Sequence, residues 1–223
     1  MPPLAVSMYV ALCATVLSTL VGVALAAWLE RIRGFVANAV ELVLTLPLVL
    51  PPTVLGYYLL VALGRESAIG HAYERIFGTS IVFTRTGAIV GACAGAIPLV
   101  LRQSRAALRS VDPIYAAAAR SLGATRFRTF LTVDLPLAKG GIVAAAVLAF
   151  ARSLGDFGVT LMVSGSIPGE TKTASIALYD ALASGEIAHA RTLAITLTAA
   201  AAACLVASAV LTRRARSEDP WVH

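Results

Sequence analysis

The chain has 223 residues, of which 58% are hydrophobic and only 13% are charged. Its mean hydropathy of +0.83 excludes an ordinary soluble domain of this length and indicates one integral membrane domain over residues 1–223. The net charge of +6 does not indicate a nucleic-acid partner, because the basic residues flank apolar segments and have no interleaved aromatics.

The first apolar segment is interpreted as a membrane helix and not as a cleaved signal peptide. Residues 24–26 (Ala-Leu-Ala) resemble a cleavage site, but no basic residue precedes Arg31. A signal peptide needs a positively charged start, which is missing here. The segment is therefore expected to stay in the membrane, with its N-terminus outside the cytoplasm.

Five segments are apolar enough to cross a bilayer, whose core of about 30 Å needs roughly 20 helical residues. They are residues 4–29, 42–63, 85–102, 135–154 and 192–212. The third is short, and we expect Arg85 and Arg102 to extend it by reaching the headgroups. The fourth requires Lys139 and Arg152 to reach the interfaces or an aqueous path. We expect an all-α bundle of five transmembrane helices, with a sixth span left open.

Charge distribution predicts the orientation of this bundle. Five spans place the N-terminus outside and the C-terminus in the cytoplasm, and 12 of the 18 basic residues then lie in cytoplasmic segments. This agrees with the positive-inside rule. Most external acids lie between Asp156 and Glu186, where residues 171–184 are expected to form a short helix on the outer surface or dipping into the membrane.

Three prolines interrupt the second predicted span. Pro47, Pro51 and Pro52 fall within the run from Leu46 to Thr53. Each proline removes a backbone donor, so the helix must kink or open there. Freed carbonyls in a membrane need to face other helices or water, so we expect this break and Thr53 to line a translocation path. A kink that serves packing alone is the alternative.

Residues 112–134 are expected to fold on the cytoplasmic face. Asp112 and Pro113 favour a helix start, and Gly123 favours its end. Thr125 is expected to cap a second short helix that ends before Pro136. The product is a compact helix-turn-helix with a small-residue surface that another protein can approach. A solvated basic connector is the alternative.

A charged segment follows the fourth span. Arg152 and Asp156 lie four residues apart and can pair on one helical face. In the alternative interpretation, Arg152 with the hydroxyls of Ser153 and Thr160 offers a transient site to a dianion, because guanidinium groups bind oxyanions bidentately.

Catalytic and metal sites are not predicted. The sequence contains no phosphate-binding loop of the Walker type, no His-Glu-x-x-His and no evident nucleophile-base pair. The three cysteines lie apart in apolar runs and predict neither disulfides nor a metal site. No cofactor is expected. A secondary transporter would favour ionisable residues deep within spans and an internal repeat, and neither is visible.

The predicted cytoplasmic helix-turn-helix resembles the Glu-Ala-Ala motif of ABC importer permeases. The matching residues are Ala-Ala-Ala at 117–119, Gly123, and Val-Asp-Leu-Pro at 133–136. Ala117 and Val133 replace the usual glutamate and isoleucine. The resemblance implies coupling helices that dock on a cytoplasmic ATPase. The implied coupling residues are Ala117, Ala118, Ala119, Arg120, Gly123, Ala124, Leu135 and Pro136.

Two further segments resemble the molybdate and tungstate type of these permeases. They are Pro-Leu-Val-Leu-Pro-Pro at 47–52 and Gly-Asp-Phe-Gly at 155–158, the latter continuing into Ile-Pro-Gly-Glu-Thr at 167–171. The resemblance extends from about residue 4 to residue 211. It implies an inner-membrane permease for molybdate or tungstate, with sulfate or another oxyanion as the alternative. The implied partners are a second copy, two ATPases that bind the ATP, and an extracytoplasmic oxyanion-binding protein.

Overall fold

The computed structural model describes residues 1–32 and 35–217, and side chains in the last helix only as far as Val210. Regular structure in this part of the chain is helical throughout. Among the basic residues counted above, Arg33 and the side chains of Arg213, Arg214 and Arg216 lie outside the described residues.

The helices follow one another along the chain in the order α1 (Pro3–Leu29), α2 (Phe35–Thr45), the short turn η1 (Leu46–Leu48), α3 (Pro52–Leu63), α4 (Ala68–Phe77), α5 (Arg85–Arg109), α6 (Pro113–Ser121), α7 (Arg126–Thr129), the wide turn η2 (Phe130–Asp134), α8 (Leu135–Leu154), α9 (Gly158–Ser164), α10 (Ala174–Ala183) and α11 (Ile187–Ser217).

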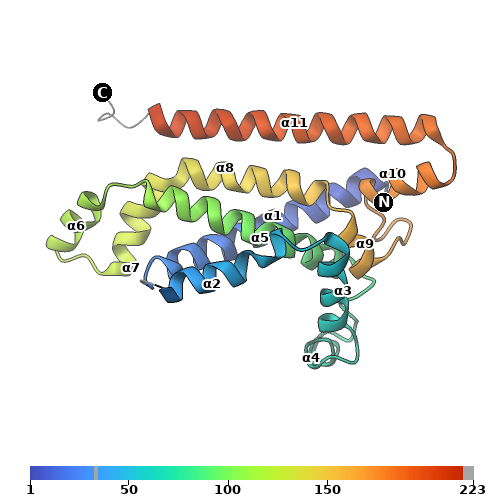
Figure 1. The fold of residues 1–223 in the computed structure, drawn as a ribbon, viewed down its shortest axis with the longest axis horizontal. Coiled ribbons are helices and arrows are strands. Elements are labelled where there is room, and N and C mark those ends of the chain that lie inside the picture. The colour runs from blue at the N-terminus through green and yellow to red at the C-terminus, as the bar shows by residue number, and fades with distance from the viewer. Residues whose placement is uncertain (33–34, 218–223) are drawn as a thin grey trace.

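The long helices run side by side along the longest axis of the molecule (Figure 1). One end carries α6 and α7, and the opposite end carries the N-terminus, α9 and α10. Below, these are called the α6 end and the α10 end. Helix α11 ends near the α6 end, opposite the N-terminus.

Within the described residues, four helices are long and apolar enough to cross a membrane, namely Pro3–Leu29, Arg85–Arg109, Arg126–Leu154 and Ile187–Val210. A fifth crossing is available if Phe35–Leu48 and Pro52–Leu63 are taken together as one broken span. The helical segments extend beyond several predicted boundaries. The third continues past residue 102 to Arg109, because polar side chains at its end are compatible with helix.

The second predicted span, residues 42–63, is not one helix. Its two halves meet at an angle of 104°. Pro51 has an extended backbone, with φ −53° and ψ 136°, and Pro52 starts a new helix. A proline disfavours the helical conformation in the residue before it and has no amide hydrogen, so two consecutive prolines end α2–η1 and restart the chain in a new direction. The break expected from the prolines is therefore present, and it is much sharper than a kink.

The second short helix of the loop does not end before Pro136, contrary to the expectation. Helix α7 passes through η2 directly into α8. The amide of Leu135 donates to the carbonyl of Phe130, which forms one wide turn. Pro136 follows this wide turn directly, so its missing amide hydrogen falls where the regular helical hydrogen-bond pattern is already interrupted. The loop is therefore joined to α8 by continuous helix.

Small residues let the long helices approach closely. A Cβ atom on Gly22 of α1 would come within 2.7 Å of Val100 Cγ1 on α5, and one on Gly141 of α8 within 2.5 Å of the Ala107 Cβ. A further cluster of α5 and α8 side chains, including Ala96 and Ala145, is completely or almost completely buried. Close backbone approach of this kind is typical of helix packing within membranes.

Candidate functional site

A bonded charge cluster connects the end of α8 to α9. Asp156 lies between these helices with its side chain only 3% exposed. One carboxylate oxygen accepts a hydrogen bond from the Arg152 guanidinium at 3.0 Å, and the other accepts the amide of Thr160 at 2.9 Å as well as its hydroxyl. Arg152 and Asp156 thus pair as the spacing indicates. Thr160 acts as a donor to the carboxylate.

The Arg152 side chain remains accessible from one side. It is 38% exposed, and its Nη2 lies where a Cβ on Gly95 of α5 would approach to 3.0 Å. The neighbouring Ser153 hydroxyl is buried and has no hydrogen-bond partner in the described residues. A guanidinium that is paired on one edge and open on another can still contact an anion.

The proline break packs against this cluster. A Cβ on Gly158, at the start of α9, would meet the Pro52 Cβ at 2.8 Å, and the amide nitrogen of Thr53 lies 3.7 Å away. Gly56 and Met162 make a second close contact between α3 and α9. Pro51, Pro52 and Thr53 remain exposed on the described chain, and Pro47 is half-buried. The structure therefore brings together two segments that are about 100 residues apart in sequence.

The loop of residues 165–173 is held by bonds to distant parts of the chain. Arg85 donates to the carbonyls of Glu170 at 3.1 Å and Gly169 at 3.0 Å. The N-terminal amine also donates to Gly169, at 3.1 Å. Arg85 therefore binds backbone carbonyls of this loop, a contact that the sequence does not predict. This loop is a fixed part of the α10 end.

A separate ion pair closes the same loop onto α10. The Lys172 ammonium lies 2.7 Å from a carboxylate oxygen of Asp180, and the Ser166 hydroxyl donates to that carboxylate at 3.1 Å. The bond from Lys172, reinforced by the one from Ser166, holds the pKa of Asp180 below its usual range. Helix α10 itself corresponds to the short helix predicted within residues 171–184, and Thr173 caps it.

At the other end, residues 112–134 form the α6–α7 loop. The Asp112 carboxylate accepts the amide of Ile114 and so caps α6, and the Thr125 hydroxyl accepts the amide of Arg128 and caps α7. Gly123 has φ +86°, and the amide of Ala124 donates to the carbonyl of Ala119. This is the glycine-terminated helix end that the sequence predicts. Space around Gly123 is open, so backbone conformation alone favours glycine there.

The α6–α7 loop presents apolar side chains outward. No residue of α6 is buried, and Leu122 and Phe127 are 89% and 64% exposed. Of the implied coupling residues, Ala119, Ala124 and Leu135 are half-buried. The remaining five are exposed, namely Ala117, Ala118, Arg120, Gly123 and Pro136. An exposed apolar surface of this kind is characteristic of a contact with another protein.

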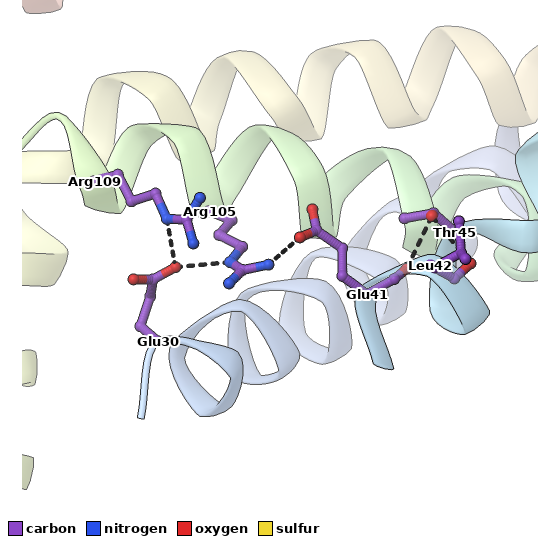
Figure 2. A network of polar contacts seen from close by, with 6 residues as sticks. All are labelled: Glu30, Glu41, Leu42, Thr45, Arg105 and Arg109. Atoms are coloured by element: carbon purple, nitrogen blue, oxygen red, sulfur yellow. Dashed lines mark hydrogen bonds and ion pairs between the residues drawn. The ribbon is translucent and has the colours of Figure 1, made fainter. Parts of the chain in front are cut away.

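Sequence reasoning missed a charge network near the α6 end of the bundle, which joins α5 to Glu30 and Glu41 (Figure 2). Arg105 of α5 donates to Glu30 at 2.7 Å and also bonds Glu41 of α2, and Arg109 donates to Glu30 at 2.8 Å. Two acids at the ends of apolar runs, and two arginines four residues apart, were the available signal. Their pairing depends on how α1, α2 and α5 pack.

No group of three or more His, Cys, Asp or Glu side chains suited to a metal ion occurs in the part of the chain that the structure describes. The features that stand out are instead a sharp break in a membrane segment, a buried charge cluster against it and an exposed apolar loop at one end. The long apolar helices around them are those of a membrane protein.

Known proteins resemble this chain in sequence over most of its length. It is 44% identical over 183 residues to the molybdenum transport system permease protein ModB of Escherichia coli (strain K12), covering 81% of this chain and 80% of that protein. It is 39% identical over 183 residues to the putative molybdenum transport system permease protein YvgM of Bacillus subtilis (strain 168), covering 82% and 81%. These relatives are transport permease proteins.

Solved structures agree in fold. The chain matches a chain of the MetNI methionine ABC transporter in an inward-facing conformation with a TM-score of 0.66 and 20% identity, covering 96% of each. It matches a bacterial ABC transporter involved in alginate import with a TM-score of 0.62 and 17% identity, covering 96% of this chain and 80% of the other. The described fold is therefore that of ABC importer permeases.

The model of one protein family matches residues 18–216. That range includes the proline break, the α6–α7 loop and the cluster around Asp156. The chain belongs to the family of binding-protein-dependent transport system inner membrane components.

Proposed function

We propose that this chain is the permease subunit of an ATP-driven importer of molybdate or tungstate. The observation that carries the proposal is its 44% identity over 183 residues to a molybdenum transport permease. The chain would form the translocation path and would leave ATP binding to a partner ATPase, so that it needs no cofactor and no catalytic residue of its own.

The α6–α7 loop is the proposed docking site of the ATPase. Its exposed alanines at 117 and 118 allow close backbone approach, while Leu122 and Phe127 supply apolar contact area. Continuous helix joins the loop to α8, so a force on the loop acts directly on a helix of the bundle. The family's glutamate is replaced by Ala117, so docking here depends on shape and on nearby basic residues such as Arg120.

The translocation path is proposed to run along the proline break and the exposed edge of Arg152. The path residues are Pro47, Pro51, Pro52, Thr53, Arg152, Ser153, Asp156 and Thr160. Support comes from the contact between Pro52 and Gly158 and from the half-open guanidinium. Asp156 and Thr160 would hold Arg152 in place, and a guanidinium paired in this way would bind a passing dianion only weakly. Weak binding suits a permease, which must release its solute.

The proposed assembly contains two copies of this chain in the cell inner membrane, two cytoplasmic ATPases and an extracytoplasmic binding protein. We place the α10 end outside and the α6 end in the cytoplasm, because Arg102, Arg120, Arg126 and Arg128 lie toward the α6 end. Closure of the ATPase dimer on ATP would draw the two α6–α7 loops together and open the path outward, and hydrolysis would reset it.

Uptake of radiolabelled molybdate tests the proposal. Cells lacking the chain are compared with cells that regain it together with its neighbouring ATPase and binding protein. We expect ATP-dependent uptake that excess tungstate suppresses and excess sulfate does not. ATP-dependent uptake of sulfate would change the solute while keeping the mechanism. Uptake that persists without the ATPase would indicate a secondary transporter and overturn the proposal.

A further inference from the structure

In the network of Figure 2, the nearly inaccessible Arg105 guanidinium of α5 bonds Glu41 of α2, and these two helices make few other contacts. The Arg105 side chain is 4% exposed. A buried guanidinium is costly unless its donors are satisfied, and here Glu30 accepts on one side and Glu41 on the other. The two acids and the two arginines balance in charge.

The two sides of the network are not equivalent. Glu30 at the end of α1 is bonded by both Arg105 and Arg109, so it keeps a partner if either one moves. The recorded partner of the Glu41 side chain is Arg105. Within the described part of the chain, the Glu41–Arg105 ion pair is therefore the only polar contact between α2 and α5.

The Glu41–Arg105 ion pair matters more for the position of α2 than a polar contact would for a more deeply buried helix such as α1. Ala37 is its one buried residue within Phe35–Thr45, whereas α1 buries nine. Val40 and Leu44 add partly buried contacts to the cluster around Leu29 and Leu101. With so narrow an apolar contact, the position of α2 relative to α5 is set in large part by the ion pair.

This ion pair connects the two parts of the molecule that transport must coordinate, the α6–α7 loop and the proline break. Helix α5 leads through residues 110–112 into α6 of the α6–α7 loop. On the other side, the Thr45 hydroxyl donates to the carbonyl of Glu41 at 2.8 Å, in the last turn before the proline break (Figure 2). A residue bonded to Arg105 is thus one turn of helix from the segment that redirects the chain toward α3 and α9.

We propose that Arg105 is a positioning residue for coupled transport, whose bond to Glu41 makes α2 follow α5 when the ATPase moves the α6–α7 loop. This inference rests on the proposed function, because it treats the chain as a permease driven through that loop. Without the bond between Arg105 and Glu41, the ATPase would still dock and hydrolyse ATP, but the proline break would move less in each cycle.

The variant Glu41→Gln removes the charge and keeps the side-chain shape. The matched control is Glu74→Gln on α4, which alters an ion pair with Arg65, a residue that precedes this helix; the side chains of Glu74 and Arg65 are 36% and 70% exposed. Each variant is reconstituted in liposomes with the ATPase and binding protein. We expect Glu41→Gln to hydrolyse ATP within twofold of wild type while moving at least fivefold less molybdate per ATP. Glu74→Gln is expected to keep the wild-type ratio.

Two more variants separate coupling from mere stability. Glu41→Asp retains the charge and is expected to recover at least half of the wild-type ratio. The double variant Arg105→Met with Glu41→Leu replaces the pair by apolar side chains, which is often neutral for stability. It is expected to unfold at the wild-type temperature and still to transport at least fivefold less molybdate per ATP.

A distance measurement is independent of the solute. Spin labels at Val36→Cys on α2 and Gln103→Cys on α5, in a chain without its native cysteines, report the separation with and without ATP. We expect one narrow distance in both states for wild type and a broadened or ATP-dependent distance for Glu41→Gln. Identical distances, together with an unchanged ratio of transport to hydrolysis, would overturn the inference. A wild-type complex that keeps the expected distances but moves no molybdate would instead refute the proposed function.

Discussion

The 165–173 loop at the α10 end and the α6–α7 loop at the other end are stabilised in different ways. At the α10 end, Arg85 and the N-terminal amine bond the 165–173 loop across 84 or more residues of sequence, and the Ser7 hydroxyl accepts the amide of Ala174 at 2.7 Å. At the α6 end, the bonds of the α6–α7 loop are local. Asp112 and Thr125 cap their own helices, and the Arg120 guanidinium donates to the carbonyl of Ala116 in the same helix.

This difference shows which hydrogen bonds hold each loop in its conformation. At the α10 end, bonds between distant segments restrict the 165–173 loop, and the close contact of Pro52 with Gly158 holds the proline break against the Asp156 cluster. The α6–α7 loop keeps its own helical shape through local bonds and exposes an apolar surface. Under the proposed function, the α10 end would shape the path and the α6–α7 loop would receive the force of the ATPase. Four substitutions test this comparison.

The largest effect is expected from removing the carboxylate of Asp156. The variant Asp156→Ala leaves Arg152 without its partner and Thr160 without its acceptor. Breaking a buried pair in this way should lower the free energy of unfolding by about 3 kcal/mol. Thermal unfolding in detergent measures the loss. Asp180→Ala, which breaks a more exposed pair, should cost less than about 1 kcal/mol. Equal losses would show that the Asp156 cluster does not hold the α10 end.

The next effect concerns the exposed surface at the other end. Phe127→Asp places a charge on the apolar face of the α6–α7 loop without disturbing the core, since Phe127 is 64% exposed. We expect affinity for the ATPase to fall by about 2 kcal/mol, roughly thirtyfold, with no change in unfolding temperature. Co-purification and titration of the ATPase measure it, with Phe127→Leu as the apolar control. A variant that binds normally would move the docking site elsewhere.

The turn between α6 and α7 offers a smaller effect. Gly123→Leu forces a side-chain residue into the left-handed backbone at φ +86°, at a cost of about 1–2 kcal/mol. ATPase-coupled uptake should fall roughly tenfold while membrane insertion stays normal. Gly123→Asn should lose much less, because asparagine tolerates this conformation. Normal uptake by Gly123→Leu would mean that the turn can relax without harm.

The smallest effect is expected from restoring the family's glutamate. Ala117 is exposed, and Ala117→Glu would place a carboxylate three residues before Arg120 on α6. Such a surface pair contributes about 0.2–0.5 kcal/mol, so assembly should be unchanged or slightly tighter. Complex formation measured by size-exclusion chromatography checks this. Failure to assemble would show that the loop of this chain has diverged from the family's interface.

Features that depend on local sequence were predictable. Apolar length indicated the membrane segments, because a bilayer demands about 20 apolar residues wherever they occur. Asp112, Thr125 and Gly123 indicated the caps and the turn of the α6–α7 loop, because these effects act within a few residues. The pairing of Arg152 with Asp156 followed from a spacing of one helical turn. The similarity of whole segments indicated the family.

The tertiary structure decided what depends on distant contacts. The prolines implied a break, but its angle of 104° and the contact of Pro52 with Gly158 depend on how α3 packs against α9. Arg85 was expected at the end of a membrane segment and Arg105 was not singled out from the sequence, and the partners of both became evident only when the helices were assembled. A charged side chain selects its partner among all groups within its reach, and that set is defined by packing and not by neighbours in sequence.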